Sequence, residues 1–131
     1  MRITSTLVTM AVISASLFAT PASAASLEDS FEKLPDEERA RQVCIVLGID
    51  KIRKDKRVAK ADRVKTSIFS QATFANNTVS TKGGAVRSNQ QWYHLSFTCH
   101  LDSDLKHAKD FTFEVGDNVP EADWEDLGLW K

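Results

Sequence analysis

The sequence has few of the residues that most catalytic and metal-binding motifs require. It holds 2 cysteines, 5 glycines, 3 prolines and 3 histidines in 131 residues. The glycine-rich patterns that cradle phosphates are missing, as are the GxSxG and HExxH motifs of hydrolases. The formal net charge is −1, so the chain also lacks the basic excess typical of nucleic-acid binding. We therefore expect no enzyme activity, no cofactor or metal, and no nucleic-acid partner.

Long hydrophobic runs are also missing, except near the start of the chain. Residues 7–19 are apolar and follow Arg2, and Ala22 and Ala24 form the small-x-small pattern that signal peptidase cuts. This run is shorter than the roughly 20 apolar residues that cross a bilayer. We therefore expect residues 1–24 to be a cleaved signal peptide, with no stable membrane insertion. Residues 25–131 should form one small periplasmic domain, with a core over about 34–130.

Charge is unevenly distributed along this expected domain. Acidic residues gather in 28–38 and 114–126, whereas basic residues gather in 51–65. A cationic surface attracts polyanions, and the cell envelope offers phosphorylated lipids and acidic polysaccharides. The basic stretch is therefore either a solvated connector balanced by the acidic segments, or a site for an anionic envelope polymer or an acidic protein surface. The candidate anion- or partner-binding residues are Lys51, Arg53, Lys54, Lys56, Arg57, Lys60 and Arg63.

The two cysteines, Cys44 and Cys99, lie too far apart for the CxxC spacing of redox and zinc motifs. In an oxidising compartment, a lone pair of thiols in a small domain is usually a disulfide. Buried free thiols and a reactive or metal-bound thiol are the alternatives. We expect a structural disulfide, which would stabilise the domain by constraining its unfolded chain.

Hydrophobic periodicity predicts an α+β fold. Pro35 and the three acidic residues after it suit a first helical turn, and apolar residues then recur at helical spacing around Cys44. Gly48 predicts a break or bend in this helix. From Gln91 to Leu101 the pattern alternates with a period of two and places Cys99 on the apolar face.

Other segments complete the expected sheet. Residues 64–70, 85–88 and 111–115 indicate further strands, and residues 76–84 indicate a loop. Short connections favour an antiparallel sheet of about four strands. We therefore expect an N-terminal helix packed on this sheet, one disulfide that joins the two, and a short C-terminal helix after Pro120.

Aromatic and histidine residues offer weaker candidates for a site. Trp124 and Trp130 either seal an edge of the core or belong to an aromatic surface that binds a ligand. An exposed Trp92, beside His94, Thr98 and Arg87 on the polar sheet face, could stack on a sugar, although packing under the 76–84 loop is the alternative. A final cluster is either a solvated connection or a surface metal site; its members are His100, Asp102, Asp104 and His107.

Four segments together resemble the domain of unknown function family 930. They are residues 38–44 (ERARQVC), 83–87 (GGAVR), 92–99 (WYHLSFTC) and 128–130 (GLW), and their order and spacing agree with the family over about 34–130. The resemblance implies an exported protein, as in alphaproteobacteria related to rhizobia, but no activity or ligand. Residues 54–62 (KDKRVAKAD) are more lysine-rich than the resemblance leads us to expect, which leaves open whether the basic stretch is local to this chain.

The sequence leaves three classes of function. The favoured class is a non-catalytic binding module of the cell envelope, whose partner is an envelope protein or an anionic polymer. The second is an inhibitor of a secreted hydrolase of the lysozyme type, by analogy of size and compartment alone. The third is a small periplasmic enzyme, which the lack of catalytic motifs disfavours.

Overall fold

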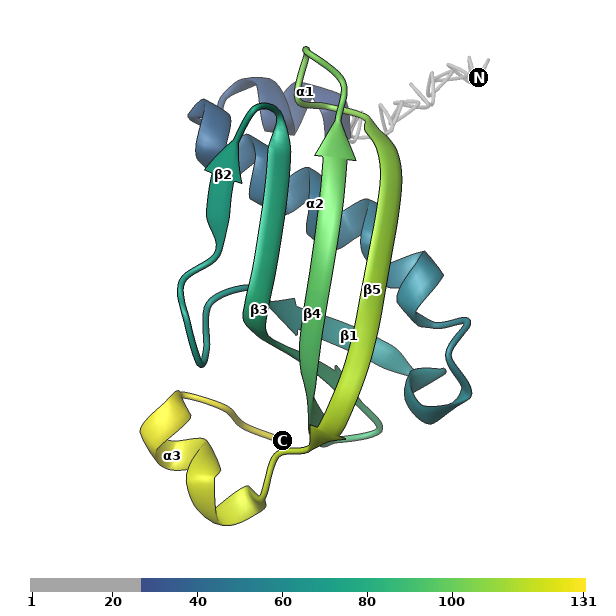
Figure 1. Ribbon diagram of the computed structural model, residues 1–131, viewed down its shortest axis with the longest axis vertical. Helices are drawn as coiled ribbons and strands as arrows, with labels where there is room; N and C mark the ends of the chain where they lie inside the picture. Colours follow the sequence, from purple (N-terminus) through teal and green to yellow (C-terminus); the bar gives the residue numbers. More distant parts are fainter. Residues whose placement is uncertain (1–26) are drawn as a thin grey trace, which may run out of the picture.

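A five-stranded antiparallel sheet with a long helix across one face forms the body of the protein (Figure 1). The computed structural model describes residues 27–131, so the expected signal peptide lies outside the described residues. Within 27–131, no helix has the length and apolar character that a membrane crossing requires. The elements are α1 (Leu27–Glu32), α2 (Asp36–Ile52), the 3-10 turn η1 (Lys56–Val58), β1 (Ala61–Lys65), β2 (Thr73–Ala75), β3 (Thr78–Ser88), β4 (Gln91–Leu101), β5 (Ala108–Asn118), η2 (Glu121–Asp123) and α3 (Trp124–Leu127).

The strand order is β1-β3-β4-β5, and β2 pairs with the other end of β3 from β1. The sheet thus has five strands where about four were expected, and the predicted α+β class is confirmed. Strand β3 reaches both short strands because it is 11 residues long and its pairing shifts between Thr81 and Gly84. This irregularity bends the strand.

Helix α2 is joined to the sheet by the predicted disulfide. Cys44 and Cys99 are bonded, with Cα atoms 6.0 Å apart, and both side chains are fully buried. Three acidic residues occupy the first turn of α2, where they interact favourably with the helix dipole. The apolar face of α2 and the helix-facing side of the sheet form one core cluster around the disulfide.

Gly48 does not break α2, contrary to the expectation from the sequence, and the helix continues to Ile52. A Cβ atom at position 48 would overlap the ring of Phe111 on β5. Glycine therefore serves close packing here: it lets the helix backbone approach the sheet where an aromatic ring fills the space.

We expect Gly48→Ala to destabilise the protein by about 1–3 kcal/mol, the usual cost of overpacking a core. In an ordinary helix the same change stabilises by about 1 kcal/mol. The sign of the change in stability therefore tells close packing at Gly48 from an ordinary helical position. Phe111 cannot easily move, because it packs against Phe97 and Phe113 with ring centroids 5.1 and 6.0 Å away. Urea unfolding measures the change, and adding Phe111→Leu should recover part of it. A stabilised Gly48→Ala protein would contradict this account.

Two tight turns connect the central strands. Asn89 and Gln90 have φ values of 51° and 63° at the β3–β4 turn, and Asn76 and Asn77 have 52° and 55° at the β2–β3 turn. Positive φ at both turn positions matches the twist of a two-residue hairpin, and asparagine tolerates it. The prediction of a loop over 76–84 was therefore wrong, because these residues form the second turn and the first half of β3. The expected strand over 64–70 is also corrected, since β1 ends at Lys65 and residues 66–72 cross to β2.

The C-terminal segment packs on the opposite face of the sheet from α2, at one end. Trp92 and Trp124 belong to a second buried cluster with Ala85, Val119 and Leu129. The indole N–H of Trp92 donates to the carbonyl of Trp130 at 2.7 Å, and that of Trp124 donates to Val119 at 3.0 Å. Gly128, with φ of 67°, ends α3 in the left-handed region. The tail covers the lower end of this face (Figure 1).

Candidate functional site

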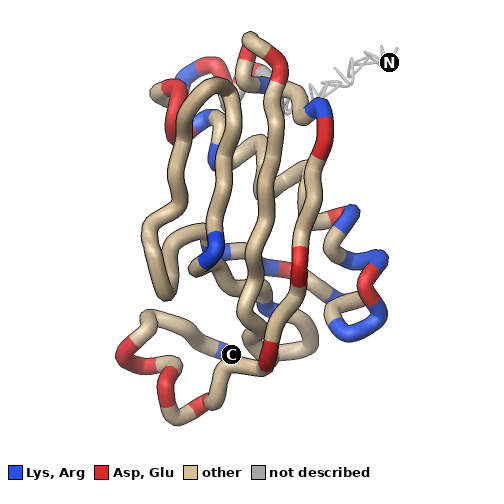
Figure 2. Tube along the Cα trace, viewed as in Figure 1, with Lys and Arg blue, Asp and Glu red and all other residues tan. Residues whose placement is uncertain are grey.

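The predicted anion-binding residues lie at one corner of the molecule, where α2 ends and the chain turns into β1 (Figure 2). We call this segment, Asp50 to Arg63, the basic corner. It contains seven basic and three acidic residues, and all seven basic residues are exposed. The predicted set therefore lies in one continuous segment, and each of its side chains is exposed to solvent.

Two arginines of the basic corner are engaged in building it. Arg53 Nε donates to the carbonyl of Ala61 at 2.7 Å, which ties the end of α2 to β1. Arg57 Nη2 donates to the carbonyl of Val115 at 2.9 Å, which ties η1 to β5. Arg57 also bonds the Asp55 carboxylate at 3.0 Å, and this hydrogen bond lowers the pKa of Asp55. These arginines are structural, since each holds a backbone carbonyl of another element.

The remaining cations of the basic corner face solvent. Within residues 27–131, their side chains form no hydrogen bond or ion pair with another protein group, and sequence reasoning could not separate them from the paired arginines. They are Lys51, Lys54, Lys56, Lys60 and Arg63.

The three tryptophans do not form the aromatic surface that the sequence left open. Trp92 is 0% exposed and Trp124 is 4% exposed, because both pack in the cluster under the C-terminal segment. Trp130 is 45% exposed, but Lys65 Nζ lies 4.5 Å from its ring centroid. Arg87 lies 5.8 Å from the same ring, so cations already occupy its surroundings.

Arg87 is itself neutralised by Asp62. The two side chains bond through Nε and Nη2 at 2.9 and 2.8 Å, and this pairing lowers the pKa of Asp62. Neither side chain therefore presents an unpaired charge on the sheet face, where the sequence predicts Arg87.

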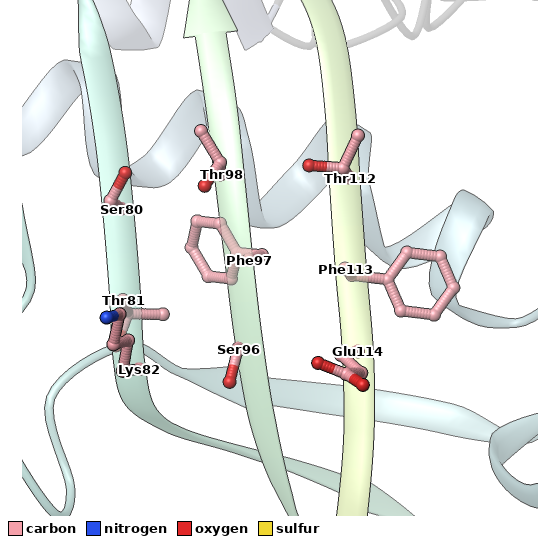
Figure 3. Close-up of a pocket in the computed structure, with 9 residues that line it drawn as sticks. All are labelled: Ser80, Thr81, Lys82, Ser96, Phe97, Thr98, Thr112, Phe113 and Glu114. Atoms are coloured by element: carbon pink, nitrogen blue, oxygen red, sulfur yellow. The ribbon is translucent and has the colours of Figure 1, made fainter.

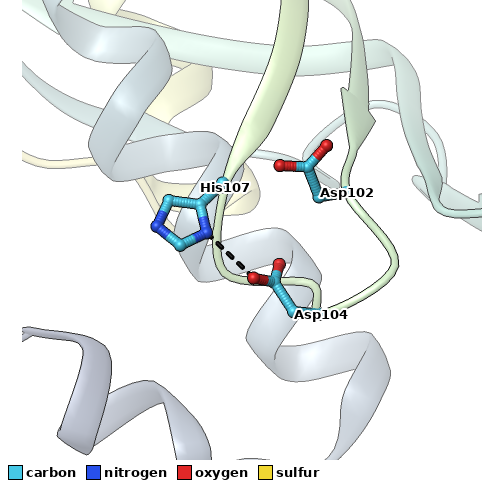
Figure 4. A group of neighbouring side chains, drawn as sticks. All are labelled: Asp102, Asp104 and His107. Carbon is cyan, nitrogen blue, oxygen red and sulfur yellow. Dashed lines mark hydrogen bonds and ion pairs between the residues drawn. The ribbon is translucent and has the colours of Figure 1, made fainter.

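The acidic and histidine cluster is a hydrogen-bonded turn between β4 and β5 (Figure 4). Asp102, Asp104 and His107 bring one ligand atom each within 4.8 Å of one another. Asp104 accepts from the backbone N–H of Lys106 at 2.8 Å and bonds His107 Nδ1 at 2.9 Å, and these bonds lower the pKa of Asp104. His100, predicted with this cluster, instead bonds Thr78 at 2.9 Å. The contacts of Asp102, Asp104 and His107 are those of a hydrogen-bonded turn, and we assign no metal to them.

A depression that the sequence did not predict lies on the sheet face opposite α2 (Figure 3). Its volume is about 520 Å³, and polar side chains of three neighbouring strands line it. A second depression of about 210 Å³ shares Ser80, Thr81 and Lys82 with it and extends the surface toward β2. We call the two together the hydroxyl groove. The sequence pattern predicts Thr98 on this face but not the contribution of β3, because it indicates a loop over residues 76–84.

Comparison with known protein families identifies the family of the chain. The model of the Domain of Unknown Function DUF930 matches residues 31–129. The chain belongs to the DUF930 family. No curated protein and no solved structure matches it.

The DUF930 match spans α2, the whole sheet and α3, so the disulfide, the basic corner and the hydroxyl groove all lie within it. The family description assigns no activity, so the evidence for the function of this DUF930 protein lies in its own surfaces.

Proposed function

We propose that this DUF930 protein is an exported, non-catalytic module of the cell envelope that binds an anionic polymer through the basic corner. The observation that carries the proposal is a difference within the basic corner: two of its arginines are paired with other protein groups, and its other five cations are not paired with any group of the described residues. Arg53 and Arg57 hold the chain through backbone carbonyls, whereas five other cations point into solvent. A fixed backbone thus presents charges that no acid of the described residues neutralises by contact.

The distribution of charge over the molecule supports the same proposal. Acidic residues of η2 and α3 lie at the lower left in Figure 2, across the molecule from the basic corner at the right. A protein with separated charge approaches a polyanion with its cationic end first, which raises the rate of productive encounter. The near-neutral total charge therefore does not argue against binding at the corner.

Export is supported by two features. The signal-peptide pattern at residues 1–24 comes from the sequence, and the Cys44–Cys99 disulfide is of the kind that persists in oxidising compartments. Mass spectrometry of the protein recovered from the periplasm of an expression host tests the proposed export. We expect Ala25 to be its first residue.

Heparin affinity chromatography of the oxidised protein tests the binding proposal. We expect retention at low salt that is lost at raised salt, because screening weakens such contacts. The variant Lys54→Gln/Lys56→Gln/Lys60→Gln should bind about 100-fold more weakly at low salt, if each lysine contributes ~1 kcal/mol as it does near an anionic surface.

A matched control removes the same charge elsewhere. Lys33, Lys109 and Lys131 are exposed and lie outside the basic corner. Changing these three to glutamine should leave retention close to that of the parent protein. Equal weakening of both triple variants would show that net charge rather than the corner is recognised, and no retention of the parent at low salt would reject the proposal.

A further inference from the structure

We infer that the hydroxyl groove is a second binding site, separate from the basic corner, which takes an uncharged carbohydrate chain. The groove crosses β5, β4 and β3 and continues to the segment before β2. Typical sites for drug-like ligands are lined mainly by apolar side chains. This one combines the apolar surface of Phe97 and Phe113 with side-chain hydroxyls of three strands, and a sugar chain likewise presents both C–H faces and hydroxyls.

Four hydroxyls of the groove are not used by the described part of the protein, whereas the hydroxyl of Thr81 donates to the carbonyl of Thr66 and accepts from the amide of Gly83. Ser80, Thr98 and Thr112 are direct neighbours across β3, β4 and β5. Within residues 27–131, the side chains of these three residues and of Ser96 form no hydrogen bond with another protein group. Each hydroxyl offers one donor and two acceptor positions. A row of such groups matches the mixed donors and acceptors of sugar hydroxyls.

The charge of the groove favours an uncharged ligand over a polyanion. Glu114 is paired with Ser96 across β4 and β5, and Lys82 lines the same depression from β3. The groove therefore carries one charge of each sign, whereas the basic corner carries an excess of one sign. The hydroxyl groove and the basic corner therefore favour ligands of different charge.

An aromatic ring is held beside the groove on the same sheet face. Phe69 is 41% exposed, and its ring stacks on His94 with centroids 4.1 Å apart and planes 19° apart. His94 is two residues from Ser96 along β4 and so points to the same face. The C–H groups of a sugar ring pack on such a surface. The ring is thus a platform beside the hydroxyls of β4.

The backbone explains why this platform is fixed. The amide of Phe69 donates to the carbonyl of Gly83 at 2.8 Å. A Cβ atom at Gly83 would overlap the backbone of Ser70, so this glycine lets residues 66–72 lie directly on β3. A large apolar side chain in water is ordinarily mobile, but here hydrogen bonding and stacking order it before any ligand arrives. Binding then costs less conformational entropy.

Amide NMR of the isotopically labelled, oxidised protein tests the inference. The probes are chitotetraose and maltotetraose, both uncharged, and a heparin octasaccharide in a separate titration. We expect an uncharged oligosaccharide to shift the amide signals of residues 80–82, 96–98 and 112–114. Thr98→Val removes one hydroxyl and keeps a β-branched residue, and Phe69→Ala removes the platform; each should weaken binding about tenfold.

Two controls separate the groove from the rest of the surface. Ser103→Ala removes an exposed hydroxyl in the β4–β5 turn, and the basic-corner variant Lys54→Gln/Lys56→Gln/Lys60→Gln removes charge. Both should bind the uncharged sugar as the parent does, even if heparin binding fails. If Thr98→Val disturbs the spectrum as a whole, Ser96→Ala replaces it with the same expectation.

Three results would overturn the inference. The first is no shift with either uncharged oligosaccharide at millimolar concentration, and the second is a shift confined to residues outside the groove. The third is broadening of the groove signals as protein concentration rises without sugar, because that would assign the face to a second copy of the chain.

Discussion

Cys44→Ala/Cys99→Ala is expected to lower the free energy of unfolding by about 4 kcal/mol. The bond closes a separation of 55 residues, and the chain-entropy model gives roughly this value for a loop of that size. Domains of this kind are stable by only about 5–15 kcal/mol, so the loss would remove a large part of the total. Both cysteines are fully buried between α2 and β4, so the bond also holds the two layers of the core together.

Urea unfolding at equilibrium measures this effect, with the parent and the double variant compared under oxidising conditions. The parent unfolded with a strong thiol reductant is the matched control, because it breaks the same bond and keeps the cysteine side chains. It should approach the midpoint of the variant. If oxidised parent and variant unfolded at the same urea concentration, the bond would not be a source of stability.

Trp92→Ala is expected to destabilise the protein by about 3–5 kcal/mol, the range for removing a fully buried aromatic side chain. Trp92 is 0% exposed and lies at the centre of the second core cluster. Its ring and that of Trp130 pack edge to face with centroids 5.7 Å apart, and its N–H donates to the carbonyl of that residue. The substitution thus opens a cavity and releases the C-terminal segment from the sheet.

Trp130→Ala is the matched control for this prediction. It removes the same type of side chain from a position that is 45% exposed, so its cost should stay below about 1.5 kcal/mol. Thermal unfolding followed by circular dichroism compares the two. Trp92→Phe should fall between them, since it keeps much of the ring but loses the N–H. Equal losses for Trp92→Ala and Trp130→Ala would contradict the anchoring role of Trp92.

Local patterns predicted much of the fold. The helical spacing around Cys44 and the alternation from Gln91 to Leu101 each report which side of an element is buried, because burial follows the period of the element itself. The lone pair of cysteines in a chain expected to be exported predicted the bond, and these two apolar faces predicted that it joins the helix to the sheet. The strand over the first half of β3 was missed because Gly83 and Gly84 are weak strand formers. They are needed there because another segment lies directly against them.

The candidate sites were less predictable than the fold. The basic stretch was visible in the sequence, but the engagement of Arg57 with Val115 depends on residues far apart in the chain. The hydroxyl groove is assembled from three strands, so the pattern of no single segment predicts it. The same holds for Phe69, whose exposure is set by its stacking on His94.

The sequence by itself determined the α+β class, the position of the long helix and the longest strand, the pair of cysteines and the existence of a basic stretch. These follow from composition and from periodicities that extend over a few neighbouring residues. Tertiary structure alone decided which basic residues are paired, which tryptophans are buried and which hydroxyls meet in one groove. The physical reason is that each of these depends on a partner distant in sequence, and the partner is set by how the sheet and the helix pack.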